Sequence, residues 1–304
     1  MLAENSEMPG LPRRSGPTQV LLTPTERVSS AAPLSEIADS RAGEGEVDLG
    51  VAASQRSCVD LAAPIAEIRE QWRRRQAWHR AEKALTLQAK ALCRRLAEEG
   101  DKAEAERIYK AALGKGAHPL AEIALAAIFP LTEARDGIAK HRAAVEKRLT
   151  KLAKALPVAP WVEATRGVGL LSLAAIVGEA GDLDAYGNPA RLWKRLGLAV
   201  MPDGNRQRRT SGVEALDHGY NPARRSVMWN VGACIVKAGG PLKAIYDARK
   251  VYEADRVETK AHAHNRAQRY VEKRFLRDLW SVWRKGGGDP ADGVTLKSHV
   301  SPAT

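Results

Sequence analysis

Residues 65–96, IAEIREQWRRRQAWHRAEKALTLQAKALCRRL, contain neither glycine nor proline, and they decide the fold class. Apolar residues are distributed along this run with charged residues between them, which is typical of an amphipathic helix. The apolar positions are Ile65, Ile68, Trp72, Leu85, Leu92 and Leu96. Aromatic residues make up only 5% of the chain, and alanine, leucine, arginine and glutamate recur throughout it. The sequence therefore predicts a mainly α fold.

The pattern continues beyond this run. Asp101 is predicted to cap a second helix. A short apolar helix over residues 120–129 is expected to stop at Pro130, and Thr132 is expected to cap the next one. Residues 61–157 are therefore predicted to form long helices. These are either a stalk or coiled-coil arm that forms a homo-oligomer, or an ordinary antiparallel bundle.

The flanking segments and the cysteines indicate the setting of the protein. Residues 1–60 are rich in Pro, Ser, Gly and Glu and are predicted to be a disordered tail, and residues 286–304 a flexible one. The three scattered cysteines favour a reducing compartment, and Cys234 is expected to be buried in a helix core. No secretory signal and no run of about 18 apolar residues is visible, so we expect a cytoplasmic protein without a membrane partner.

Positive charge is concentrated in one region. Residues 191–285 contain 21 Lys/Arg against 9 Asp/Glu, an excess equal to the net charge of the whole chain, +12. Such a concentration is typical of a surface that binds a polyanion, because neutralised phosphates release counterions. The alternative is that the surplus arginines only solvate basic helices. The sequence favours DNA as the partner, with a structured RNA as a second candidate.

A helix-hairpin-helix pattern begins near residue 160. A short helix leads into TRGVG at residues 165–169, and an apolar helix follows over residues 170–179. The two glycines allow a tight turn that can approach a phosphate, while the next helix directs free N–H groups towards it. We therefore expect Arg166, Gly167 and Gly169 to contact DNA without reading its bases, although a plain helical turn is the alternative.

A polar loop with three arginines follows a predicted basic amphipathic helix, residues 191–198, whose Leu192, Trp193 and Leu196 are expected to point inwards. The loop, MPDGNRQRRTSG at residues 201–212, is predicted to be a mobile segment that becomes ordered on a phosphate backbone. Its predicted nucleic-acid contacts are Arg206, Arg208 and Arg209, joined by Arg224 and Arg225 at the start of a later helix.

Candidate catalytic and metal-binding groups are few. Ser211 could act as a nucleophile, with Asp217 or His218 as its base, although a serine before a glycine is more often a turn residue. The carboxylates of Glu179, Asp182 and Asp184 lie where a helix ends, which favours capping and turn roles over a metal site. His262 and His264 would point apart on a helix. We therefore predict no metal site and no visible cofactor.

Residues 164–285, about 40% of the chain, resemble the carboxy-terminal domain of transposases of the insertion-sequence 110/116/902 type. The similarity rests on the order and spacing of several blocks. These are RGVG at 166–169, IVGEAGD at 176–182, ARLWKRLGL at 190–198, HG at 218–219, RR at 224–225 and KRFLRDL at 273–279.

The resemblance implies a DNA recombinase that works with an RNA partner and has a two-part active site. An amino-terminal RNase H-like domain would supply acidic metal ligands, and the carboxy-terminal domain would supply a serine from the loop after the LGL block. Ser211 lies in that loop, whereas a nearly gap-free register places DGN at 203–205 at the family's Ser-Gly pair. VDL at 47–49 is similar to the first acidic strand of the RNase H-like domain, but nothing after it continues that fold.

These observations lead to three hypotheses. The first is a transposase-like DNA-binding protein of a mobile element or phage that takes part in DNA transposition or recombination. It would lack the RNase H-like domain, and magnesium would enter only through a partner that supplies the acidic site. The second is a non-catalytic architectural or regulatory nucleic-acid-binding protein. The third is an interaction protein whose long helices dimerise.

Overall fold

The computed structural model describes residues 61–287, and within them it is mainly α-helical, as predicted. The predicted tails, residues 1–60 and nearly all of 286–304, lie outside the described residues. The elements are α1 (Ala62–Leu96), η1 (Glu98–Gly100), α2 (Lys102–Ala112), α3 (Ala121–Lys154), α4 (Ala159–Ala164), α5 (Leu170–Ala180), α6 (Pro189–Arg195), α7 (Gly212–His218), α8 (Pro222–Ala238), α9 (Pro241–Ala254) and α10 (Lys260–Arg284). In the part of the chain that the structure describes, no helix has the length and apolar character needed to cross a membrane.

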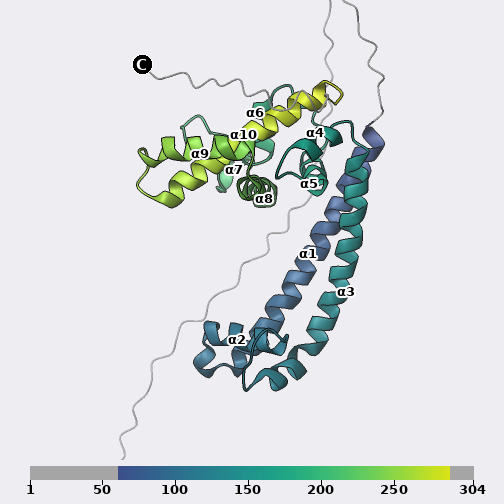
Figure 1. Cartoon of the computed structure of the whole chain (residues 1–304), viewed down its shortest axis with the longest axis vertical. Helices are drawn as coiled ribbons and strands as arrows, with labels where there is room; N and C mark the ends of the chain where they lie inside the picture. The colour runs from purple at the N-terminus through teal and green to yellow at the C-terminus, as the bar shows by residue number, and fades with distance from the viewer. Residues whose placement is uncertain (1–60, 288–304) are drawn as a thin grey trace, which may run out of the picture. The chain divides into compact units, whose positions relative to one another are not determined.

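The two longest helices, α1 and α3, run antiparallel and lie side by side over much of their length (Figure 1). They have 35 and 34 residues. The short helix α2 packs against both of them. Asp101 caps α2 as predicted, because its carboxylate accepts hydrogen bonds from the backbone N–H groups of Ala103 and Glu104.

The predicted break at Pro130 is wrong. Pro130 lies inside α3, which continues without interruption to Lys154. A proline within a helix removes one backbone hydrogen bond and crowds the preceding turn. The helix persists because Ile128 and Thr132, on either side of the proline, are both buried. Thr132 is not a cap either, since its hydroxyl donates to the backbone oxygen of Phe129 within the same helix.

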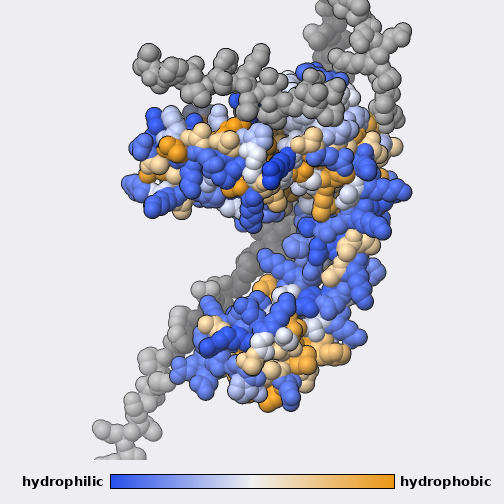
Figure 2. Space-filling model, in the orientation of Figure 1, coloured by the Kyte–Doolittle hydropathy of each residue, from blue (hydrophilic) through white to orange (hydrophobic). Residues whose placement is uncertain are grey.

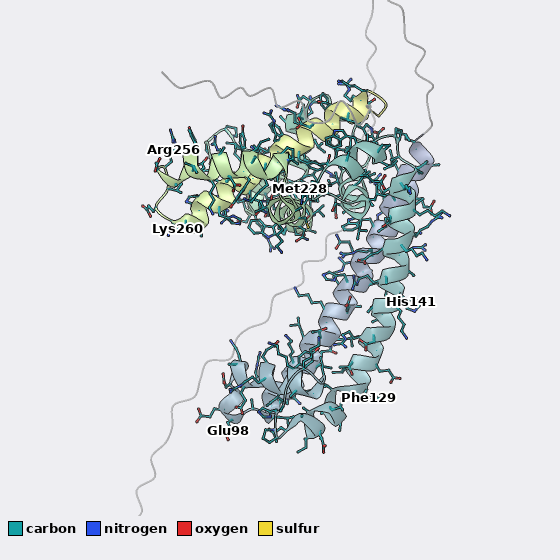
Figure 3. The ribbon with its side chains drawn as sticks, in the orientation of Figure 1. Glu98, Phe129, His141, Met228, Arg256 and Lys260 are labelled. Carbon is teal, nitrogen blue, oxygen red and sulfur yellow. The ribbon has the colours of Figure 1, made fainter. Side chains whose placement is uncertain are left out.

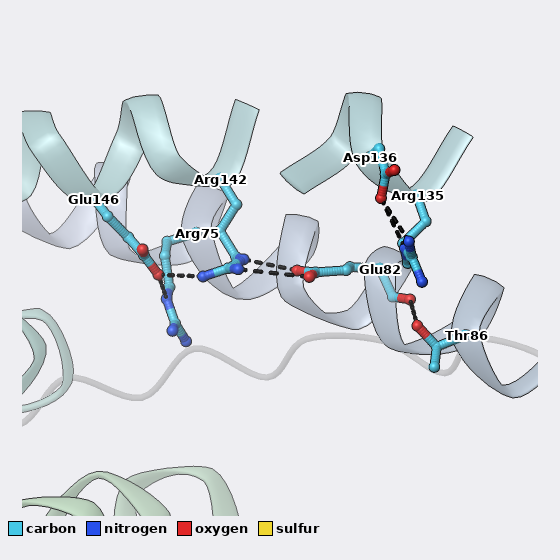
Figure 4. A network of polar contacts seen from close by, with 7 residues as sticks. All are labelled: Arg75, Glu82, Thr86, Arg135, Asp136, Arg142 and Glu146. Atoms are coloured by element: carbon cyan, nitrogen blue, oxygen red, sulfur yellow. Dashed lines mark hydrogen bonds and ion pairs between the residues drawn. The ribbon is translucent and has the colours of Figure 1, made fainter. Parts of the chain in front are cut away.

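Polar contacts between α1 and α3 form a connected network (Figure 4). The guanidinium of Arg142 on α3 lies 2.7 Å from Glu82 on α1 and 2.8 Å from Glu146 on its own helix. Glu146 also accepts a hydrogen bond from Arg75 of α1. Further towards the end of the pair, Arg148 bonds Glu67. Several arginines of α1 and α3 therefore pair with carboxylates of the other helix or of the next turn of their own helix.

Two groups of buried side chains hold the described residues together. The smaller one lies where α1, α2 and α3 meet, and it includes Cys93, Ile108 and Ile128. The larger one joins the first turns of α1 and the last turns of α3 to the helices after residue 157. At its centre the ring of Trp161 stacks on that of Phe275, with centroids 5.9 Å apart.

Three of the helices after residue 157 start at a side-chain cap. Asn188, Asn221 and Thr259 each accept a backbone hydrogen bond at the start of α6, α8 and α10. Helix α10 packs against α6, α8 and α9. Figure 3 shows Met228 on α8, and it shows Arg256 and Lys260 at the turn between α9 and α10. Met228 is fully buried in the larger core.

Candidate nucleic-acid interface

The glycines of the predicted hairpin have different surroundings. Gly167 has a positive φ of 89°, and a Cβ atom there would lie 2.8 Å from the Cα of Ile235 on α8. Gly169 has an extended backbone, is exposed, and has open space where a Cβ would be. Helix, turn and helix thus follow in the predicted order. Gly167, however, is required by a close approach to α8, whereas Gly169 faces solvent.

Arg166 lies at the surface of this hairpin. Its side chain is exposed and runs along Gly240, where a Cβ atom would lie 3.2 Å from the Cδ of Arg166. No carboxylate lies within ion-pair distance of Arg166 among residues 61–287. The hairpin therefore contributes one uncompensated cation to the surface.

The loop after α6 is held by backbone and side-chain contacts. Val200 pairs with Arg206 in an isolated antiparallel bridge, and the N–H of Met201 donates to the oxygen of Asn205. Gln207 is buried, and its amide donates to the backbone oxygens of Lys194 and His218. The loop thus has an anchored backbone at its centre.

The three arginines of this loop point to solvent. Arg206, Arg208 and Arg209 are all exposed on either side of the buried Gln207. Arg208 lies 3.9 Å from Glu214, and both of these side chains are more than half exposed, so the pair neutralises little. We call Arg206, Arg208 and Arg209 the arginine loop.

A short helix that the sequence did not predict, α7, follows the loop. Ser211 is its exposed N-cap residue. His218, a candidate base, is buried: its Nδ1 accepts a hydrogen bond from the N–H of Arg208, and its Nε2 lies 3.4 Å from Glu214. Among residues 61–287 no hydrogen bond joins Ser211 to His218 or Asp217. The serine is accessible but has no base positioned on it in this arrangement.

Arg225 has an internal partner. Its guanidinium lies 2.8 Å from Glu272 of α10, which is fully buried, and 5.7 Å from the centre of the Trp229 ring. Burial raises the pKa of Glu272 to about 7, against the opposing effects of Arg225 and of a hydrogen bond from Gln268. Arg225 therefore stabilises the contact between α8 and α10, and little of it reaches the surface.

Arg224 and the three carboxylates near the end of α5 also have internal partners. Glu179 accepts a hydrogen bond from the indole of Trp72 on α1, and its other oxygen lies 3.5 Å from Arg224. Asp182 accepts from the backbone N–H of Asp184, which confirms a turn role. In the described part of the chain, no group of three or more His, Cys, Asp or Glu side chains is placed to hold a metal ion.

A pocket beside the arginine loop was missed by sequence reasoning. Its volume is about 440 Å³, within the usual range for small-ligand sites. It is lined by Asn188, Ala190, Arg191, Trp193, Lys194, Ala199, Val200 and Lys273. Lys273 comes from α10, about 80 residues after the other lining residues, so sequence spacing gave no sign that they meet. We call this site the Trp193 pocket.

Comparison with protein family models, characterised proteins and solved structures found no match for this chain. The exposed cations of the hairpin, the arginine loop and the Trp193 pocket all belong to the segment from α4 to α10. The arginine loop and the Trp193 pocket adjoin each other through Val200 and form the candidate nucleic-acid interface, whereas Arg166 lies against Gly240.

Proposed function

We propose that this chain is a transposase-like nucleic-acid-binding protein of a mobile element or phage, and that DNA is its main ligand. The protein would take part in DNA transposition or recombination by holding the nucleic acid. The acidic half of a recombinase site would come from a partner, together with any magnesium ion. A structured RNA is a second ligand of the same chemistry, because it presents the same phosphates.

The observation that carries this proposal is a set of cations without carboxylate partners on an anchored backbone. Arg206 and Arg209 are exposed and have no ion pair among residues 61–287, and Arg208 has only a weak one. The buried amide of Gln207 holds the segment between them. Phosphate contacts made from such a loop position a nucleic acid without reading its sequence.

A non-catalytic architectural or regulatory role is the second candidate, and the environment of Ser211 favours it. No general base is hydrogen-bonded to this hydroxyl in the described residues. A serine without an activating base is a weak nucleophile. Recombination by this chain would therefore need groups from a partner, whereas DNA binding would not.

We also propose a homo-oligomer formed through the α1–α3 pair. The first turns of α3, residues 120–131, read LAEIALAAIFPL and contain a single charged residue. Ile123 and Phe129 are more than half exposed there, and Figure 2 shows apolar surface at this end of the pair. A helix that is apolar on all sides is normally covered, and a second copy of the same surface would cover it.

The test of nucleic-acid binding is fluorescence anisotropy with duplex DNA, branched DNA, single-stranded DNA and a structured RNA, each at several salt concentrations. We expect tight binding to duplex or branched DNA that weakens steeply as salt rises. Absence of binding to all four ligands at low salt would contradict the proposal. A strand-transfer assay with Ser211→Ala, run together with the partner that supplies the acidic half, then separates the two candidates, because only a recombinase would lose an activity.

A further inference from the structure

The Trp193 pocket combines an aromatic ring with cations from two separate parts of the chain. Trp193, Arg191 and Lys194 come from α6, and Lys273 comes from α10. The ammonium of Lys273 lies over one face of the half-buried Trp193 ring, 5.2 Å from its centre. An aromatic face beside several cations is the combination that unpaired nucleotides bind, because the base stacks and the phosphate is neutralised.

The indole is held in a fixed orientation. Its N–H donates to the backbone oxygen of Lys273, 3.2 Å away, so the ring is attached to α10. Leu192 of the same helix and Leu196, its C-cap residue, are fully buried and fix α6 against the core. A ring with its polar edge already bonded and its helix anchored can receive a flat ligand at little entropic cost.

The cations of the pocket have no acidic partners. Arg191, Lys194 and Lys273 form no ion pair within residues 61–287, and none of the lining residues is acidic. By contrast, Lys243 and Arg249 in the neighbouring helix α9 each pair with a carboxylate one turn later. Burial and the nearby Arg269 lower the pKa of Lys273, a cost that a bound phosphate would relieve.

We propose that the Trp193 pocket binds an unpaired nucleotide within a nucleic-acid strand, with its base against the indole and its phosphates on Arg191, Lys194 and Lys273. This inference rests on the proposed nucleic-acid binding and names the structure recognised: a bulge, gap, branch or single strand. In a fully paired duplex the bases are stacked, so placing one of them against the ring would cost the free energy of unstacking it.

The pocket is continuous with the arginine loop. Val200 lines the pocket and also pairs with Arg206 through the isolated bridge. Lys194 lines it as well, and its backbone oxygen accepts the hydrogen bond from the buried Gln207. A strand whose phosphates follow the loop therefore reaches the pocket within the same short segment of protein, which favours a nucleotide in a strand over a free one.

The test uses the full chain and a 20-base-pair DNA duplex with one unpaired 2-aminopurine, compared with the same duplex fully paired. Anisotropy gives the two affinities, and 2-aminopurine fluorescence reports the surroundings of the unpaired base. We expect the bulged duplex to bind roughly tenfold more tightly, with quenched 2-aminopurine emission, because one base stacks on the ring. Trp193→Ala should abolish the preference and the quenching, and Trp193→Phe should keep most of both.

A second variant, at an exposed residue, tests the inference even if Trp193→Ala does not fold. Lys194→Glu changes an exposed side chain of the pocket and should also remove the preference for the bulge. Lys237→Glu, an exposed lysine on α8 outside the pocket, is its charge-matched control and should keep the preference. Unchanged preference in both Trp193→Ala and Lys194→Glu would overturn the inference.

The remaining outcomes separate this inference from the proposed function. Equal affinity of the wild-type protein for bulged and paired duplexes overturns the pocket inference and leaves nucleic-acid binding intact. No binding to either duplex contradicts nucleic-acid binding itself. Adenosine monophosphate is added as a competitor. Displacement of the bulged duplex at nucleotide concentrations near the duplex Kd would assign the pocket to a free nucleotide and overturn the assignment to a strand.

Discussion

The α1–α3 pair and the helices from α4 to α10 both contain cations with and without a carboxylate partner, and they differ in where the cations without one lie. Residues 61–157 contain 20 Lys/Arg against 12 Asp/Glu, and residues 191–285 contain 21 against 9, so cations exceed carboxylates in both regions. In the α1–α3 pair, Arg75, Arg142 and Arg148 each contact a carboxylate. In the second region, Arg206, Arg209 and the cations of the Trp193 pocket contact no carboxylate among residues 61–287, and Arg208 has only the weak pair with Glu214.

This difference shows why composition is a weak guide to a binding surface and placement a stronger one. An arginine between two helices with a glutamate opposite stabilises the pair and has little charge left for a ligand. An exposed arginine on an anchored loop without a carboxylate keeps its charge available. The second region also has a carboxylate in its core, because Glu272 is fully buried and pairs with Arg225.

The largest expected effect concerns the hairpin, and it tests whether its glycines serve packing or phosphate contact. Gly167→Ala would place a side chain in a left-handed conformation, with its Cβ against the backbone of α8. We expect a loss of roughly 3 kcal/mol in the free energy of unfolding, measured by urea denaturation. Gly169→Ala is the matched control and should change stability by less than about 0.5 kcal/mol. Equal losses in the two variants would contradict the packing role of Gly167.

The next prediction concerns the buried carboxylate of Glu272. Its pKa is about 7 in the folded protein and near 4.5 in the unfolded chain, so the folded state holds a proton that the unfolded state releases between these values. The contribution of Glu272 to stability is therefore fully present below about pH 4.5 and falls by roughly 3 kcal/mol as the pH rises through 7.

Other carboxylates titrate in the same range, so this contribution is read from a variant. Glu272→Gln keeps the shape of the side chain and cannot ionise. The stability of the wild-type protein relative to Glu272→Gln should fall across the interval from pH 4.5 to 7.5, measured by urea denaturation at each pH. Two parallel stability curves would show that burial does not raise the pKa of this group.

A smaller effect is expected in the α1–α3 pair. Arg142 is three-quarters buried and contacts two carboxylates, so Arg142→Met should cost about 1–2 kcal/mol in thermal or urea unfolding. Arg73 is two-thirds exposed and pairs only with Glu70 on its own helix, so Arg73→Met should cost less than about 0.5 kcal/mol. A loss at Arg73 as large as that at Arg142 would mean that the network between the helices adds nothing.

The oligomer proposal predicts a change in mass. Sedimentation velocity of the wild-type chain should show a species larger than a monomer, and a double substitution of Ile123 and Phe129 to Glu should shift it to the monomer. Both side chains are exposed, so the substitution should leave the fold intact. A wild-type monomer at micromolar concentrations would refute this part of the account.

Much of the helical fold could be predicted because the signals are local. The periodicity of residues 65–96 and the carboxylate of Asp101 act within a few turns, and both predictions are confirmed. The break at Pro130 was wrong because packing on both sides of the proline outweighs its local cost. Cys234 is exposed rather than buried, since the buried stripe of α8 runs through Val231 and Ile235 beside it.

The site was less predictable because its parts meet only in the fold. Arg206, Arg208 and Arg209 were identified from a polar, glycine-containing loop, and the structure leaves all three exposed. Burial of Glu272 was not predicted, because a glutamate on a basic helix is usually exposed to solvent. The Trp193 pocket required Lys273 of α10, which follows Trp193 by 80 residues, so no local pattern brings the two together.

The central claim is that nucleic acid binds to the unpaired cations after residue 157 and not to those of the α1–α3 pair. The most direct test compares two triple variants with equal loss of charge by measuring duplex affinity at several salt concentrations. One variant changes Arg206, Arg208 and Arg209 to Glu, and the other changes the exposed Arg80, Lys83 and Lys147 of α1 and α3 to Glu. The account predicts weaker binding to every sequence for the loop variant, with a salt slope flatter by about one unit per lost contact, and a slope close to wild type for the other. An unchanged slope in the loop variant, or an equal flattening in both, would contradict it.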